Sequence, residues 1–233
     1  TREGILKHCS RDNAQRLGAV AERFLHDGQP SLEAQVTNVA DEVAYNNHDI
    51  DDGLRAGLLT LDQLGAVELF RVRYEQVKAQ YPGLDNRRVQ HETVRRMIDA
   101  LVSDLIVTSR DAIREAAVAD PDAVRSLSEP LIRFSPDMAR QNRELKRFLR
   151  QNLYHHHRVY RMTVKAQRIV HDLFSAFMED SKLLPEHFQV HAQRLSQCEE
   201  HGSARGIADY IAGMTDRHAI REHHRIFDLR TLI

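Results

Sequence analysis

The amino-acid sequence predicts an all-α protein, and two observations support that prediction. Glycine and proline are scarce, at 10 and 6 of 233 residues, and tryptophan is absent, whereas the helix-favouring residues Ala, Leu, Arg and Glu are frequent. Apolar residues recur every three or four positions along most of the chain, and no stretch alternates apolar and polar residues as a half-buried strand would. We therefore expect a multi-helix bundle that forms a single helical domain over residues 1–233.

The composition also excludes several protein classes. Cys9 and Cys198 are far apart and lack CxxC spacing, which argues against a disulfide framework and a thiolate zinc site and favours a cytoplasmic setting. No apolar run approaches the roughly 18 residues of a membrane span, so no membrane partner is expected. No secretory signal is visible, and a net charge of −1 does not indicate a partner.

The central element is a helix predicted over residues 31–54. Ser31 is a typical N-cap, Glu33 lies in the first turn, and Gly53 is a typical signal for the helix end. At roughly 100° per residue, one stripe of this helix is apolar and is expected to be buried: Leu32, Val36, Val39, Val43, Ile50 and Leu54. The opposite face carries polar and aromatic groups: Asn38, Asp41, Tyr45, His48, Asp49 and Asp52.

The other helices are predicted from the same apolar period and from turn signals. Their ranges are 12–26, 61–80, 86–119, 136–179 and 203–220, with a further segment starting at Pro185. In the 86–119 helix we expect the buried side to contain Val89, Val94, Met97, Ile98, Leu101, Leu105, Ile106 and Ile113. Ser135 and Pro136 form an N-cap followed by proline at the first helical position, and a bend is expected near the three histidines 155–157.

The polar face of the 31–54 helix is the first candidate for chemistry. Asp41, Tyr45 and Asp49 are four residues apart, so their side chains line one face. A carboxylate is a good ligand for Mn²⁺ or Mg²⁺, and Tyr and Asp can hydrogen-bond a polar ligand. One carboxylate cannot hold a metal ion by itself. A solvated acidic face is the alternative interpretation.

A basic run over residues 140–168 is the second candidate. It holds nine Lys or Arg residues, against the single acid Glu144, and Tyr154 and Tyr160 lie among them. Such a run suits a phosphate-binding surface or a nucleic-acid patch. It also fits an exposed basic face that acids on a neighbouring element balance, and the spacing does not separate these interpretations.

The segment 205–218, RGIADYIAGMTDRH, is the third candidate. Gly213 in a helix interior costs about 1 kcal/mol relative to alanine, so we expect it to mark tight packing against another helix or a ligand. The chain contains no GxxxxGK[ST], GxSxG or HExxH pattern, so P-loop, serine-hydrolase and zincin chemistry are not supported.

Two of these segments, VADEVAYNNHDIDDGL and ADYIAGMTDRHA, closely resemble the deoxyguanosinetriphosphate triphosphohydrolase-like family of HD-domain hydrolases. The opening TREGILKH and the middle FSPDMARQNRELKRFLRQNLYHHHRV are similar too, so the resemblance covers essentially the whole chain. It implies an HD-superfamily-type helical bundle. It also implies metal-dependent hydrolysis of a dGTP-like dNTP, which yields the deoxynucleoside and inorganic triphosphate.

The resemblance also implies roles for individual residues. Asp41 matches a metal ligand, whereas Tyr45 and Asp49 match residues that contact the sugar, where the Tyr disfavours a 2′-hydroxyl and the Asp binds the 3′-hydroxyl. Lys146 and Tyr154 resemble a pair that contacts phosphate and substrate. A further set belongs to a segment that lines the substrate pocket: Arg205, Asp209 and Tyr210. The family also implies a homo-oligomer and an allosteric nucleotide.

One departure from the family pattern concerns catalysis. The family's H…HD motif and its His/Glu catalytic segment precede the match to TREGILKH, and neither occurs in this chain, which begins with Thr1. We therefore expect this chain to be the C-terminal portion of such an enzyme, without catalytic residues of its own and inactive alone. The alternative function is a non-catalytic helical module that binds nucleotides or nucleic acid through the 140–168 run.

Overall fold

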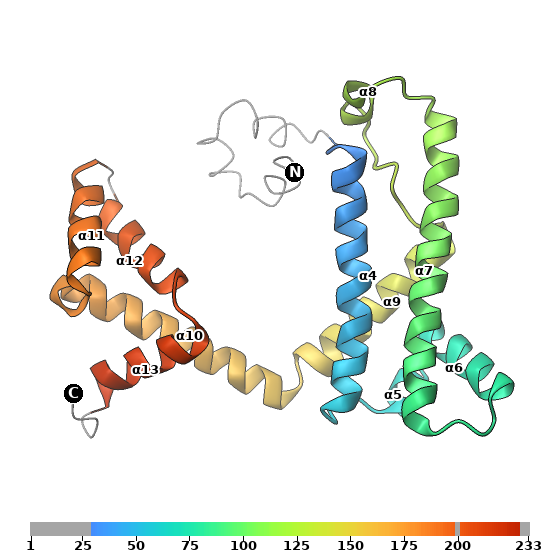
Figure 1. Cartoon of the computed structure of the whole chain (residues 1–233), viewed down its shortest axis with the longest axis horizontal. Helices are drawn as coiled ribbons and strands as arrows, with labels where there is room; N and C mark the ends of the chain where they lie inside the picture. The colour runs from blue at the N-terminus through green and yellow to red at the C-terminus, as the bar shows by residue number, and fades with distance from the viewer. Residues whose placement is uncertain (1–28, 199–200, 229–233) are drawn as a thin grey trace. The chain divides into compact units, whose positions relative to one another are not determined.

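Helices account for all regular secondary structure in residues 29–198 and 201–228, the part of the chain that the computed structural model describes (Figure 1). The all-α prediction is confirmed for these residues. Four sequence predictions lie outside these residues: the 12–26 helix, Cys9, the match to TREGILKH and the Cys198 side chain. The helical elements are α4 (Leu32–Arg55), α5 (Leu61–Leu64), α6 (Glu68–Gln80), α7 (Asn86–Ala116), α8 (Pro121–Arg125), α9 (Pro136–Leu149), the π-helix η1 (Arg150–Tyr154), α10 (His157–Glu179), the 3₁₀-helix η2 (Ser181–Leu183), α11 (Glu186–Cys198), α12 (Gly202–Ala212) and α13 (Asp216–Phe227).

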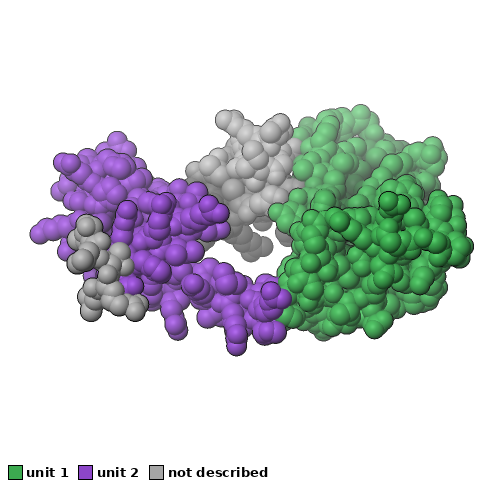
Figure 2. All heavy atoms as spheres, turned by 60° about the horizontal axis from the view of Figure 1, so that its bottom comes forward, with its two compact units in different colours: residues 1–156 green, residues 157–233 purple. Residues whose placement is uncertain are grey.

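The chain divides into two compact units, residues 1–156 and 157–233, coloured separately in Figure 2. The division falls at His156, inside the predicted 136–179 helix, where α9 and η1 end and α10 begins. The predicted 136–179 helix is therefore interrupted near the three histidines, where a bend is expected. The single helical domain predicted for residues 1–233 stays a prediction.

In the first unit, α4 packs beside α7 and α9 (Figure 1). The shared core is apolar and includes residues of α4, α6, α7 and α9: Val43, Ile50, Leu69, Phe70, Met97, Leu101, Leu145 and Leu149. Each fully buried side chain of this kind contributes about 1.5–3 kcal/mol relative to an exposed one. This core fixes one face of α4 against its neighbours and leaves the polar face outward.

The predicted start of α4 is confirmed, and its predicted end is wrong. Ser31 Oγ accepts a hydrogen bond from the Ala34 backbone amide at 3.4 Å, as an N-cap does. The helix continues through Gly53 to Arg55, and the residue with positive φ is Gly57, at +65°. Gly53 instead packs closely, because a Cβ atom there would lie 2.6 Å from Leu59 Cδ1.

The buried face of α4 differs from the predicted stripe in its composition. Val43 and Ile50 are buried as expected, but Val36 is 45% exposed. Three polar side chains of this helix are buried instead: Gln35, Asn46 and Asn47. Gln35 Oε1 accepts hydrogen bonds from the backbone amides of residues 131 and 132 at 2.9 and 3.1 Å, so its burial follows from a partner about a hundred residues away.

In the first unit, two predicted helices end or divide at other residues than expected. The 61–80 helix is two helices, because Thr60 and Gln63 form a capping box around α5 and Gly65 closes it. The 86–119 helix ends at Ala116, before the left-handed Ala117, and Asp120 begins α8. On α7, the side chain of Ile106 is 60% exposed, so the prediction that it is buried is wrong.

In the second unit, α10 packs on α12 through an apolar core that includes Ile169, Leu173, Phe177, Ile207 and Tyr210. The predicted 203–220 helix is divided between α12 and α13, because Gly213 is the C-cap of α12 and Thr215 is the N-cap of α13. A Cβ atom on Gly213 would meet only carbonyl oxygens of its own turn, at 3.5 Å. The expectation that Gly213 marks tight packing against another helix is therefore wrong among the described residues, and a ligand there stays a prediction.

Gly206 is the glycine at which α12 closely approaches α11. A Cβ atom there would lie 2.8 Å from Ala192 Cα. We expect Gly206→Ala to lower the free energy of unfolding by about 1–3 kcal/mol, because the two helices must separate. The matched control is Gly213→Ala, which has room for the methyl group and should change stability far less. Equal denaturation curves for the two variants would contradict this packing.

Candidate active site

Asp41, Tyr45 and Asp49 line one face of α4, as their four-residue spacing predicted. Asp41 is exposed, Tyr45 is 64% exposed and Asp49 is half-buried. Within the described part of the chain, the Asp41 carboxylate has no hydrogen-bond or ion-pair partner. The face therefore presents a free carboxylate, a phenol ring and a second carboxylate in consecutive turns.

Tyr154 comes from a different element and meets this face at Asp49. Its hydroxyl donates a short hydrogen bond to Asp49 Oδ2. Tyr154 is the last residue of η1, and a π-turn of this kind is rare in helices and frequent at functional sites. Burial, followed by the hydrogen bond to Asp49 and the electrostatic effects of Asp49 and Tyr45, raises the pKa of Tyr154 to about 12.

This raised pKa predicts the behaviour of one phenol in a spectroscopic titration. In the wild-type protein, Tyr154 should ionise only near pH 12, because its neutral phenol is the form that donates to Asp49. We therefore expect Tyr154→Phe to lower the tyrosinate absorbance of the titration curve near pH 12 and to leave the rest of the curve unchanged. Difference spectra of the two proteins between pH 9 and 12.5 measure this. Loss of absorbance near the ordinary pKa of 10.0 would show that Tyr154 does not make this hydrogen bond.

Lys146 reaches α4 one residue beyond Asp41. Its ammonium nitrogen lies 2.8 Å from Glu42 Oε2, and Asn142 Nδ2 donates to Glu42 Oε1 at 2.7 Å. Asn46 Nδ2 in turn lies 3.4 Å from Asn142 Oδ1. The structure therefore brings Lys146 and Tyr154 to the helix that carries Asp41, Tyr45 and Asp49.

Sequence reasoning missed Glu42 and Asn142. Glu42 is next to Asp41, about 100° around the helix from it, so it fell between the apolar stripe and the polar face. Its partners Asn142 and Lys146 are 100 and 104 residues away. The only signal in the sequence is that residues 142 and 146 share a helix face, four positions apart.

A metal site is supported by Asp41 alone. No group of three His, Cys, Asp or Glu side chains in the described residues is placed to hold an ion. Asp41 suits the role of one ligand, because its carboxylate is exposed, makes no internal interaction there and is a hard oxygen donor. His48, which follows Tyr45 by three residues, is exposed and joins no such group.

The basic run over residues 140–168 is divided between the two units. In the first unit, Arg140 is paired with Glu68 and Asp137, and Lys146 is paired with Glu42. Other cations of the run are exposed and have no carboxylate partner among the described residues: Arg143, Arg147, Arg150, Arg161, Lys165 and Arg168. The interpretation that neighbouring acids balance the run is thus confirmed for Arg140 and Lys146.

The predicted residues of the 205–218 segment lie in the second unit. Arg205 Nε donates to Asp209 Oδ1 at 2.9 Å on the exposed side of α12. Tyr210 is 7% exposed, and its ring packs against Phe177 and Phe188. Burial raises the pKa of Tyr210. A role for these residues in substrate binding stays a prediction.

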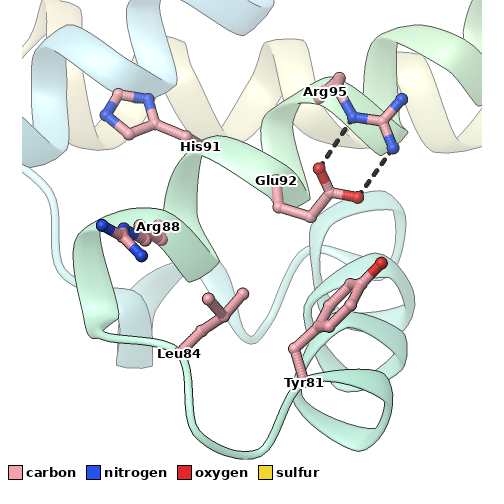
Figure 3. A pocket seen from close by; sticks show the side chains of 6 residues that line it. All are labelled: Tyr81, Leu84, Arg88, His91, Glu92 and Arg95. Atoms are coloured by element: carbon pink, nitrogen blue, oxygen red, sulfur yellow. Dashed lines mark hydrogen bonds and ion pairs between the residues drawn. The ribbon is translucent and has the colours of Figure 1, made fainter.

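A separate hollow of about 390 Å³ lies where α6 meets α7, lined by Tyr81, Leu84, Arg88, His91, Glu92 and Arg95 (Figure 3). Two of the charged groups in the hollow, Glu92 and Arg95, pair with each other, whereas Arg88 pairs with Asp85 and His91 lies 3.6 Å from Asp51. Arg95 donates to both oxygens of Glu92, at 2.7 and 2.8 Å, and Arg96 donates to the same carboxylate at 2.9 Å. Hydrogen bonds from Arg95 and then Arg96 lower the pKa of Glu92 from 4.5 to about 2.

The lowered pKa of Glu92 makes stability depend on pH in the acid range. Its contribution is fully present above pH 4.5 and is lost as the pH falls through about 2, because the unfolded chain binds the proton first. The loss should be on the order of 1 kcal/mol, since the pair is near the surface. We expect Glu92→Gln to flatten the fall in melting temperature over this range. An unchanged profile would contradict the pairing.

Comparisons with known proteins identify the family. A model of the phosphohydrolase-associated domain matches residues 132–225. The chain is 56% identical over 229 residues to a deoxyguanosinetriphosphate triphosphohydrolase-like protein of Bordetella pertussis, and the match covers 98% of this chain and 58% of that protein. The chain belongs to the deoxyguanosinetriphosphate triphosphohydrolase-like family. The family resemblance noted from the sequence is thus confirmed.

Other members of the deoxyguanosinetriphosphate triphosphohydrolase-like family are similarly close. A protein of that name from Ralstonia nicotianae is 53% identical over 232 residues, covering 100% of this chain and 58% of its own length. One from Nitrosomonas europaea is 51% identical over 227 residues, covering 97% and 59%. The chain therefore spans somewhat more than half the length of the relatives it matches. In its described residues, no helix is long and apolar enough to cross a membrane.

Proposed function

We propose that the full-length protein hydrolyses a dGTP-like dNTP to the deoxynucleoside and inorganic triphosphate. The proposed reaction needs a divalent metal ion. This chain would supply one metal ligand and part of the substrate-binding wall. The observation that carries the proposal is the Asp41, Tyr45 and Asp49 face with Lys146 and Tyr154 beside it. It occurs in a chain 51–56% identical to proteins named deoxyguanosinetriphosphate triphosphohydrolase-like.

Asp41 is the proposed metal ligand, for Mn²⁺, Mg²⁺ or a similar ion. When bound, such an ion supplies Lewis acidity and lowers the pKa of water. The other ligands would come from residues outside those described. This chain alone, with one ligand and no catalytic residue, is expected to release no triphosphate.

The remaining residues of the face would bind the nucleotide. Tyr45 is exposed enough for its ring to lie against a deoxyribose, where it would disfavour a 2′-hydroxyl. Asp49, held by the Tyr154 hydroxyl, would accept a hydrogen bond from the 3′-hydroxyl. Lys146 would donate charge-assisted hydrogen bonds to the triphosphate oxygens.

The proposal has four further features, of which the cytoplasmic location rests on the cysteine usage and the others on the family. Substrate contacts are proposed for Arg205, Asp209 and Tyr210. A homo-oligomer, an allosteric nucleotide and a cytoplasmic location are proposed as well, and the exposed faces of the long helices are where copies of the chain could pack.

The test of the proposal is the identity of the products. The full-length protein is incubated with each dNTP and Mn²⁺ or Mg²⁺, and the phosphorus NMR spectrum and the nucleosides are followed. We expect inorganic triphosphate and deoxynucleoside in equal amounts, and none after chelation of the metal. Release of orthophosphate or pyrophosphate, or no turnover of any dNTP with either ion, contradicts the proposal.

The exposed cations of the 140–168 run, such as Arg143 and Arg147, favour a second candidate function. On that view the protein is a non-catalytic module that binds nucleotides or nucleic acid. Its affinity for single-stranded DNA would then fall steeply with salt concentration, because phosphate contacts release counterions. Salt-dependent DNA binding by a full-length protein that turns over no dNTP would favour this candidate.

A further inference from the structure

Glu42 lies beside the proposed metal ligand and holds two groups from α9. One carboxylate oxygen accepts from Lys146 at 2.8 Å and the other accepts from Asn142 at 2.7 Å. We propose that Glu42 is a positioning residue that aims the Lys146 ammonium at the triphosphate of the substrate. The inference rests on the proposed function, and it adds a residue to which neither the sequence nor the family comparison assigned a role.

The need for such a residue follows from the chemistry of lysine. A lysine ammonium sits on a flexible four-carbon stem with many rotamers, so an exposed lysine does not hold one direction. Lys146 is 48% exposed in its side chain. Its ammonium has three N–H donors, and the bond to Glu42 uses one, which leaves the others for phosphate oxygens.

Glu42 is itself fixed from the buried side. Asn142 is 4% exposed and Asn46 is 7% exposed, and the two lie within hydrogen-bonding distance of each other, at 3.4 Å, between α4 and α9. Asn142 then donates to Glu42, so a buried amide holds the carboxylate that holds the exposed ammonium. Glu42 follows Asp41 directly on α4. The Lys146 ammonium, which comes from α9, therefore pairs with the residue next to the proposed metal ligand.

Two other roles for Glu42 make different predictions. If the ion pair with Lys146 only holds α9 against α4, Glu42→Gln would change stability and leave the KM for the nucleotide unchanged. A carboxylate that competes with phosphate for Lys146 would, when neutralised, lower the KM for the nucleotide. Positioning predicts a higher KM and an effect that disappears when Lys146 is absent.

The experiment is a double-mutant cycle in the full-length protein, with Glu42→Gln, Lys146→Ala and the two combined. We expect Glu42→Gln to raise the KM for dGTP by about 3- to 10-fold with little change in kcat, because a partly exposed pair holds the ammonium. Lys146→Ala should raise KM at least as much, and the double variant should equal Lys146→Ala. The control is Asp52→Asn, an exposed acid elsewhere on α4, which should leave KM unchanged.

Additive effects in the double variant, an unchanged KM or a lowered KM would each overturn the positioning role. Failure of the proposed function is recognised separately, because the wild-type protein would then turn over no dNTP. In that case the affinity of each variant for inorganic triphosphate, measured by calorimetry, tests the inference. Weaker binding by Glu42→Gln but not by Asp52→Asn supports positioning, and equal binding by Glu42→Gln and wild type overturns it.

Discussion

Replacing Asp41 with alanine in the full-length protein should reduce metal-dependent triphosphate release by about 10³-fold or more, since a bound metal ion contributes several kcal/mol of charge stabilisation. The fold should not change, because the Asp41 side chain is exposed and makes no hydrogen bond or ion pair within the described residues. Initial rates of dGTP hydrolysis at saturating Mn²⁺ measure the effect, and a melting curve checks the fold.

Asp52→Asn is the matched control for this prediction. It removes an exposed carboxylate from the same helix, three turns from Asp41, and should leave the rate near that of the wild-type protein. Unchanged triphosphate release by Asp41→Ala at equal metal concentration would show that Asp41 is not a ligand. A lower melting temperature for Asp41→Ala would instead show that Asp41 has a structural role.

Replacing Tyr45 with alanine should weaken the discrimination between a deoxynucleotide and a ribonucleotide. The ring is 64% exposed on α4, one turn after Asp41, so its removal leaves space on the face without opening the core. We expect the ratio of kcat/KM for dGTP to that for GTP to fall by about 10- to 100-fold, the range that steric rejection of one hydroxyl can supply.

Tyr45→Phe separates the ring from its hydroxyl group. If the ring excludes the 2′-hydroxyl by contact, Tyr45→Phe should keep most of the discrimination that Tyr45→Ala loses. An unchanged ratio in Tyr45→Ala would exclude Tyr45 as the residue that reads the sugar, and an equal loss in both variants would assign the discrimination to the hydroxyl.

The helices could be predicted from the sequence wherever local chemistry decides them. Ser31 caps α4 and Ser135 caps α9 as expected, because an N-cap depends on neighbouring residues alone. Helix ends were less predictable. Gly53 is a helix-end signal by type, but Leu59 packs against it and the chain turns at Gly57 instead.

The candidate site was predictable to the extent that it lies on one helix. Asp41, Tyr45 and Asp49 share a face because of a four-residue spacing that the sequence displays. The hydrogen bonds that Lys146 and Tyr154 make with α4 join residues 104 and 105 positions apart. No local pattern encodes such contacts, so Lys146 and Tyr154 were placed by family resemblance, and Glu42, which has no role in it, was missed.

We propose that the reaction proceeds by attack of water on the α-phosphorus of a dNTP, which breaks its bond to the sugar oxygen. Hydrolysis of dGTP by the full-length protein in oxygen-18 water tests it most directly. Attack on the α-phosphorus breaks the bond to the 5′-oxygen, which leaves as the deoxynucleoside hydroxyl and takes up a proton. We expect the label in inorganic triphosphate and none in the deoxynucleoside. Label in the deoxynucleoside, or labelled deoxynucleotide accompanied by pyrophosphate, would contradict it.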